Sequence, residues 1–283
     1  MRQKLSPLIK LYDYPKQVPL LDVSSSENFI TSWKKTLTDA ELSDACLTDS
    51  QSYDFEKMCF PVITSALNQP SKLETVRARF HRVFERIEPL FQHHFGPIEM
   101  KMHLLIGLCN GAGWVLRMDP MPTLLFGLEK IIELGWTEDE HLESLMLHEW
   151  GHVVHFHHRK GDIEPSTDVT KESVMQLYME GFAEYVEELI RTSSHRQKQE
   201  WLNFCSTNIY LIKQTYLDFM RMKKSTQPFF GDWVRVLGQP DLGYYLGLQW
   251  IKFMAKDNDL MTIAKLDYPD LEKNLIDFLT QAI

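Results

Sequence analysis

The segment His148-Glu149-Trp150-Gly151-His152 constrains the fold of this chain more than any other feature. In an α-helix, residues four apart are separated by about 40° around the axis, so His148 and His152 project from one face and can bind a single metal ion. Glu149 lies about 100° from His148, which turns it away from the ligand direction but leaves it near any water at the metal. The pattern therefore predicts a helix that presents two ligands and one adjacent carboxylate.

The sequence on either side of this segment favours such a helix. Thr137 and Glu140 have the spacing of a capping box, in which two side chains bind the first amide groups of a helix. Gly161 is of the residue type that commonly ends a helix, and we expect the helix to end there. Apolar side chains recur between these points at helical intervals: Leu142, Leu145, Met146, Trp150 and Val153.

The sequence before this helix predicts a helical region followed by a small sheet. Residues 1–25 contain Pro7, Pro15 and Pro19 and are expected to be irregular, and Ser26 and Ser71 mark the expected starts of two helices. The second of these should end near Gly96. From Ile98 the apolar period changes from helical to twofold, so a small mixed sheet is expected between residues 98 and about 127.

A polar loop follows the motif helix, and another helix is expected from about residue 170 to 191, with further helices to the end of the chain. The predicted fold class is therefore α+β, dominated by helices, with a small mixed sheet that precedes the motif helix. We expect two regions. Residues 1–97 form an N-terminal helical region, and residues 98–283 contain the sheet, the motif helix and the C-terminal helices.

A catalytic metal ion usually takes three protein ligands and keeps one position for water, so a third ligand is expected. One candidate is Glu180, in the segment Met179-Glu180-Gly181-Phe182-Ala183-Glu184-Tyr185. Glu180 and Glu184 share a helical face and would repel each other unless Glu180 binds a cation while Glu184 accepts a hydrogen bond from a ligand histidine. The alternative is a solvated acidic face that continues through Glu187 and Glu188.

A second candidate ligand is His158, which follows the motif at the spacing of the third histidine in metzincins. Metzincins have a glycine where this chain has His155, and that glycine lets the helix break so that the third histidine returns to the metal. An unbroken helix would carry His158 away from the ion. We therefore expect His155, His157, His158 and Arg159 to form a solvated helix end, where cations complement the helix dipole.

The two segments HEWGH and EGFAEY together resemble the gluzincin clan of zinc peptidases, in which a second helix supplies a glutamate ligand. From about residue 98 to 255, the chain also resembles a bacterial family of uncharacterised, predicted zinc-dependent proteases. The resemblance implies a zincin-like fold and one catalytic Zn²⁺ bound by His148, His152 and Glu180. The chain departs from gluzincin aminopeptidases in having Met179 instead of asparagine and a longer interval before Glu180, which leaves aminopeptidase specificity open.

Hydrolysis of a peptide also needs a donor that stabilises the oxyanion of the tetrahedral intermediate. The segment Gly243-Tyr244-Tyr245-Leu246-Gly247 resembles the Tyr-x-x-Gly start of the helix that carries the catalytic tyrosine in gluzincin aminopeptidases. Tyr244 has the required spacing to Gly247 and is favoured over Tyr245. The alternative is that both rings only pack at the start of a helix.

Composition and charge limit the partners of the chain. A net charge of −9 argues against nucleic acid, because phosphate contacts need clustered Lys and Arg. No uninterrupted apolar run approaches the roughly 18 residues of a membrane span, and the first residues lack the apolar core of a signal peptide, so we expect a cytoplasmic protein. The four cysteines are far apart and are expected to be reduced and mostly buried: Cys46, Cys59, Cys109 and Cys205.

These features predict a zinc metallopeptidase with a peptide or protein substrate, in which Glu149 acts as the general base. We expect an extended peptide to add to the sheet edge at Asn110–Val115, where glycines permit close approach of a backbone. Two other functions fit the same residues. One is a non-catalytic protein that binds peptides or regulates a partner, and the other is a zinc hydrolase of a non-peptide amide or ester.

Overall fold

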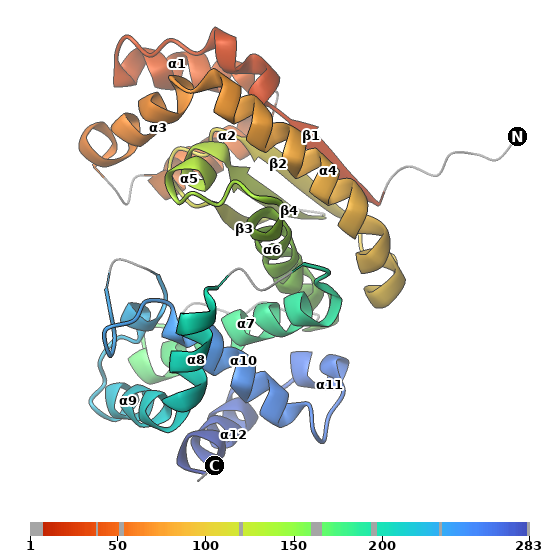
Figure 1. Ribbon diagram of the computed structural model, residues 1–283, viewed down its shortest axis with the longest axis vertical. Coiled ribbons are helices and arrows are strands. Elements are labelled where there is room, and N and C mark those ends of the chain that lie inside the picture. Colours follow the sequence, from red (N-terminus) through yellow and green to blue (C-terminus); the bar gives the residue numbers. More distant parts are fainter. Residues whose placement is uncertain are drawn as a thin grey trace, which may run out of the picture. The chain divides into compact units, whose positions relative to one another are not determined.

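The computed structural model describes residues 8–37, 39–50, 54–118, 121–159, 166–193, 197–231 and 234–281 (Figure 1). The chain divides into two compact units, Met1–Glu149 and Trp150–Ile283, which we describe separately. Helices dominate, and a small mixed sheet precedes the helix that contains the HEWGH segment. The predicted α+β class is therefore confirmed.

The sheet belongs to the first unit and has four strands: β1 (Ile9–Asp13), β2 (Met100–Leu105), β3 (Gly113–Met118) and β4 (Met121–Gly127). Their order is β1-β2-β4-β3. β1 and β2 run parallel, as do β2 and β4, whereas β3 runs antiparallel to β4 and lies at the edge. Three of the four strands lie where the twofold apolar pattern predicted a sheet.

Strand β1 is a correction, because residues 1–25 were expected to be irregular. Ile9–Asp13 pairs with β2 along its whole length, from Ile9 opposite Met100 to Asp13 opposite Leu104. The strand is short, and Lys10 and Asp13 interrupt its apolar character, so its periodicity is a weak signal. Pairing with the buried strand β2 determines its conformation, and that pairing is not visible in the local sequence.

The other elements of the first unit before α6 are helical: η1 (Pro15–Leu20), α1 (Ser26–Thr36), α2 (Ala40–Ser50), η2 (Phe55–Cys59), α3 (Phe60–Leu67), α4 (Pro70–Phe95) and α5 (Leu128–Glu133). α4 packs on the sheet, where the ring of Phe80 meets that of Phe126 edge to face at 5.0 Å between centroids. It ends as predicted at Gly96, whose φ of 82° suits glycine.

Two predicted helix starts are wrong by one or two residues. The side chain of Ser25, rather than Ser26, accepts the amide N–H of Asn28 and caps α1. α4 begins at Pro70, one residue before Ser71, because a proline at the first helical position lacks the N–H that would otherwise need a partner.

Arginines on α4 hold the first turns of α6 (Asp139–Arg159). Arg82 binds Asp139 at 2.5 Å, and Arg86 binds the buried carboxylate of Glu143 at 2.9 Å. The guanidinium of Arg79 donates to the carbonyl of Thr137 at 2.7 Å. The capping box predicted from Thr137 is not formed in that register, because α6 begins at Asp139. The predicted end of this helix at Gly161 lies outside the described residues.

The second unit contains α7 (Val169–Ile190), α8 (Gln199–Thr207), α9 (Ile209–Arg221), η3 (Gln227–Phe229), α10 (Leu242–Met254), α11 (Leu260–Ala264) and α12 (Tyr268–Thr280). Asp168 caps α7 by accepting the amide N–H groups of Thr170 and Lys171. α7 and α10 lie side by side (Figure 1), and Gly181 of α7 meets Gly247 of α10 so closely that a Cβ at Gly181 would lie 2.4 Å from the Gly247 carbonyl carbon. α7 is therefore held along one side by α10.

The four cysteines are free thiols, and three of them are buried, as expected: Cys46, Cys59 and Cys205. Within the described ranges, no helix is long and apolar enough to cross a membrane.

Candidate metal centre

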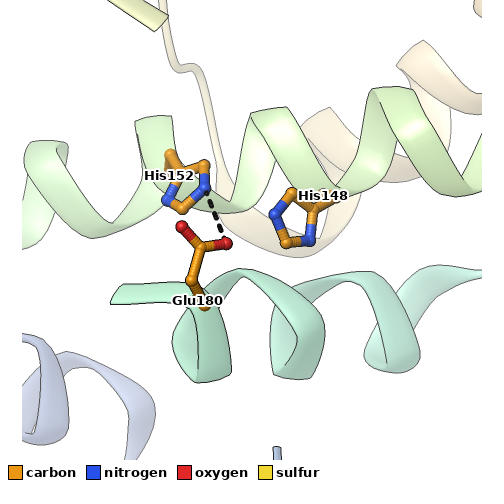
Figure 2. Close-up of side chains that lie close together, drawn as sticks. All are labelled: His148, His152 and Glu180. Carbon is orange, nitrogen blue, oxygen red and sulfur yellow. Dashed lines mark ion pairs between the residues drawn. The ribbon is translucent and has the colours of Figure 1, made fainter. Parts of the chain in front are cut away.

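Helix α6 presents the three residues of the HEWGH segment that carry chemistry. The helix is unbroken from Asp139 to Arg159, so His148 and His152 lie one turn apart, as predicted. His148 and Glu149 are buried, whereas the side chain of His152 keeps 15% of its surface exposed. Both imidazoles point from α6 toward α7 (Figure 2).

Gly151 lets α7 approach α6 at this level. A Cβ at Gly151 would lie 2.6 Å from the Cα of Ala183 and 2.9 Å from its carbonyl oxygen, which is closer than real Cβ atoms come. Only glycine fits, and its absence of a side chain brings the α7 backbone against that of α6. The Gly151–Ala183 contact thus places Glu180, one turn before Ala183 on α7, in front of His152.

The predicted ligands lie together. Oε2 of Glu180 is 3.7 Å from Nε2 of His152 (Figure 2). One ligand atom from each of His148, His152 and Glu180 lies within 4.8 Å of the other two. Ligand atoms at about 2.1 Å from a tetrahedral zinc are roughly 3.4 Å apart, so small side-chain movements suffice for one ion to bind all three. The three residues are close enough to bind a metal ion.

A second group of buried acids surrounds His148. One carboxylate oxygen from each of Glu184 and Glu187 lies within 4.8 Å of a ring nitrogen of His148 and of the other. The alternative of a solvated acidic face is wrong for Glu184 and Glu187, which are buried, and correct for Glu188, which is exposed. Glu184 thus lies where a carboxylate can orient a ligand histidine.

Glu187 is the one member of these groups that sequence reasoning did not select. It is completely buried, and Arg191, four residues later, binds it at 2.8 Å. The signal was present as a Glu-to-Arg pair at i,i+4 on the face that also carries Glu180 and Glu184. An ion pair at that spacing is usually exposed, and only the packing of α7 buries it.

The carboxylate of Glu149 lies against the edge strand β3. A Cβ at Gly113, the first residue of β3, would lie 2.8 Å from Cγ and 2.9 Å from Oε1 of Glu149. The sheet edge predicted at Asn110–Val115 includes the start of this strand, and the edge position of β3 is confirmed. The main chain of an edge strand and the predicted general base are therefore neighbours.

The prediction of a solvated helix end is wrong for His155. This residue is completely buried, with its ring stacked on Phe182 at 4.4 Å between centroids and edge to face with Tyr178 at 4.7 Å. Burial lowers the pKa of His155 well below its ordinary value. His155 continues the face of His148 and His152 by one more turn, so it meets α7 and not water.

His158 is not brought to the two ligand histidines. The helix continues through it to Arg159, and its ring packs against His157 at 5.1 Å between centroids. The groups of potential ligands found among the described residues do not contain it. The straight helix explains this, because without a break ten residues of helix advance by about 15 Å from His148.

Tyr244 and Tyr245 lie in the first turn of α10, and both are partly buried. The ring of Tyr244 meets Phe230 edge to face at 5.5 Å, and that of Tyr245 meets Trp201 at 6.0 Å. Burial raises the pKa of Tyr245. These contacts are those of aromatic packing, and the choice of Tyr244 as the oxyanion donor stays a prediction.

No protein-family model, curated protein or solved structure matches the chain.

Proposed function

We propose that the chain is a zinc-dependent peptidase whose ion is held by His148, His152 and Glu180. The single observation that carries this proposal is the approach of these three ligand atoms to within 4.8 Å of one another. Two imidazoles and one carboxylate suit zinc, and three protein ligands leave a position for water or substrate. A zinc ion bound there would polarise the scissile carbonyl and lower the pKa of the attacking water.

Glu149 is the proposed general base. Its position next to His148 on α6 turns it away from the ligand direction, so it is left for proton transfer and not for metal binding. In the proposed reaction, its carboxylate takes a proton from the attacking water and delivers it to the leaving amine. Tyr244 is retained as the proposed donor to the developing oxyanion.

The proposed substrate is an extended peptide that lies along β3. An edge strand has main-chain N–H and C=O groups on its outer side, and a peptide can add to it through hydrogen bonds that do not depend on sequence. Because Gly113 packs against Glu149, a peptide aligned with the start of β3 would present a backbone carbonyl close to the base. This supports a peptide in preference to a small amide.

Glu149→Gln is the direct test of the proposed function. The substitution keeps the size of the side chain and removes its basicity, so the protein should bind one zinc per chain while kcat falls by about 10²- to 10⁴-fold. Peptide hydrolysis and metal content would be measured on the same preparation. Glu188→Gln is the matched control, because Glu188 is exposed on α7 and should leave both values unchanged.

The substrates and the metal supply the remaining controls. Unmodified peptides, N-blocked peptides and small amides would be assayed with and without a chelator, and activity should be confined to peptides and lost with the metal. Zinc binding without any turnover in the wild type would favour a non-catalytic peptide-binding protein. Turnover that survives in Glu149→Gln would reject the assignment of the base.

A further inference from the structure

A completely buried carboxylate lies in the first turn of α5, outside the candidate metal centre. Glu129 accepts the amide N–H of Gly107 through both oxygens, at 2.9 and 2.8 Å, and that of Cys109 through Oε1 at 2.8 Å. Gly107 and Cys109 belong to the connection between β2 and β3. Glu129, in the helix that directly follows β4, thus binds residues that lie 22 and 20 positions earlier in the sequence.

The connection needs such an anchor because its backbone is unusual. Leu108 and Cys109 have φ values of 58° and 63°, in the left-handed region that non-glycine residues rarely adopt. Two successive residues of this kind persist only where the surroundings hold them. The carboxylate of Glu129 binds the N–H groups on both sides of Leu108, so it holds the turn at the point where the turn is least favourable.

The same turn determines where β3 begins. The backbone N–H of Asn110 donates to the carbonyl of Gly107 at 3.3 Å, and its side-chain NH₂ donates to the carbonyl of Cys46 at 2.8 Å. The carbonyl of Ala112 accepts the N–H of Gly127 at 3.1 Å. These contacts fix the chain from the Glu129 anchor to the residue that precedes β3.

Gly113, the next residue, is the one that packs against Glu149. The two residues are tightly packed, since a Cβ at Gly113 would lie 2.8 Å from Cγ of Glu149. A shift of the start of β3 by a fraction of an ångström would therefore move the wall against which the carboxylate of Glu149 rests. The same shift would move the main-chain groups that a peptide would pair with.

We infer that Glu129 is a positioning residue, which holds the turn at residues 107–109 so that the start of β3 keeps Glu149 and an extended peptide in register. The inference rests on the proposed function for its effect on hydrolysis. Glu129 touches neither the proposed ligands nor Glu149 in any described contact, so it acts only through the turn and β3. It should therefore change the rate of hydrolysis without changing zinc binding.

Glu129→Gln, in the zinc-loaded full chain, tests this inference. An amide keeps the shape of the side chain but leaves one oxygen for both N–H groups and turns its NH₂ group toward the N–H of Gly107, which weakens the anchor. We expect kcat to fall by roughly 10-fold or more, as small misplacements of catalytic groups do, with one zinc still bound. Amide hydrogen exchange of β3, read at Trp114 and Leu116, which lie opposite Leu125 and Thr123 of β4, should become faster.

Glu133→Gln is the matched control, since Glu133 lies on the same short helix and its exposed carboxylate pairs with Lys130. It should leave kcat and the exchange of β3 unchanged. Combining Glu129→Gln with Gly113→Ala should give less than the product of the two single effects on kcat, because both act by displacing the start of β3. A double variant whose kcat falls by the full product of the two single effects would overturn the inference. A Glu129→Gln protein with wild-type kcat and wild-type exchange in β3 would overturn it as well.

If the Glu129→Gln protein does not fold, Cys109→Gly would be added to it in a double variant. Glycine adopts a positive φ without strain, so Cys109→Gly should restore folding if the anchor acts on the turn, and a failure to restore it would count against the inference. Hydrogen exchange needs no substrate. If the wild type hydrolyses no peptide, the proposed function fails, while faster or unchanged exchange in β3 still decides whether Glu129 positions the strand.

Discussion

Two neighbouring stretches of the α6–α7 contact place histidines in opposite surroundings. In the polar stretch, His152 is 3.7 Å from Glu180 and keeps partial access to water. In the aromatic stretch, one turn further along α6, His155 is completely buried and packs against Tyr178 and Phe182. The two residues have the same chemistry and lie on the same face of one helix.

The difference shows that the partner helix decides what each histidine can do. A carboxylate and access to water favour a metal ligand, whereas burial between aromatic rings disfavours the charged form of an imidazole. The aromatic stretch is also hydrogen-bonded to the chain in and just after α11. Tyr178 donates to the carbonyl of Ile263 at 2.6 Å, and Arg159 donates to that of Leu266 at 2.8 Å. We infer that the aromatic stretch holds the two helices together while the polar stretch keeps its acids close.

The largest expected effect separates the two histidines by metal affinity. His152→Ala should weaken zinc binding by about 100-fold or more, because even residues that only orient a ligand contribute 10- to 100-fold. His155→Phe should leave zinc affinity within about threefold, since neither ring nitrogen of His155 has a hydrogen-bond partner among the described residues. Titration of both variants with zinc against a competing chelator measures the difference. Equal losses would remove the distinction between the stretches.

Gly151→Ala should disturb both stretches at once. The added methyl group would lie 2.6 Å from the Cα of Ala183, so the helices must separate. We expect a net loss of about 2 kcal/mol in the free energy of unfolding, because overpacking costs up to about 3 kcal/mol and the gain in helix propensity returns about 1 kcal/mol. Denaturant unfolding of the metal-free protein measures it. A variant as stable as the wild type would show that the two helices do not need this close contact.

A smaller effect, on pH dependence, extends the comparison to His103 in the first unit. His103 is buried with its ring stacked on Tyr12 and Tyr14, and burial lowers its pKa to about 4. Below about pH 6.5 the unfolded chain binds a proton at this residue that the folded chain does not, so stability is present above that pH and falls as the pH decreases. Well below pH 6.5, each unit of pH lowers the free energy of unfolding by up to about 1.4 kcal/mol.

The unfolded histidine is only half protonated at pH 6.5, so the expected loss from His103 is about 1 kcal/mol between pH 6.5 and pH 5.5. His103→Phe should remove that part of the slope. Unfolding curves of the wild type and the variant across this range measure it. Parallel stability profiles for the two proteins would mean that His103 is protonated in the folded state, contrary to its aromatic surroundings.

The sequence predicts those features of the site that depend on a single helix. The spacing of His148, Glu149 and His152, and the shared face of Glu180 and Glu184, follow from helical periodicity alone. The burial of Glu187 and His155 does not, because it depends on which helix packs against which. The close contact of Gly151 with Ala183 is of the same kind.

The same distinction applies to the fold. Strand β2 has the twofold alternation that predicts it, and short apolar runs mark β3 and β4, whereas β1 depends on pairing with β2. The turn held by Glu129 was also beyond sequence reasoning, because two left-handed residues that are not glycine give no local signal. Long-range contacts decide both, and a single sequence does not record them.

The coordination of zinc in the loaded wild-type protein tests the central claim most directly, and X-ray absorption at the zinc edge measures it. We predict one ion per chain with two imidazole nitrogens at about 2.0–2.1 Å, and carboxylate oxygen at about 2.0–2.2 Å that is lost in Glu180→Ala. Three imidazoles in the wild type, with the third lost in His158→Ala, would contradict the claim. A sulfur ligand at about 2.3 Å would contradict it as well.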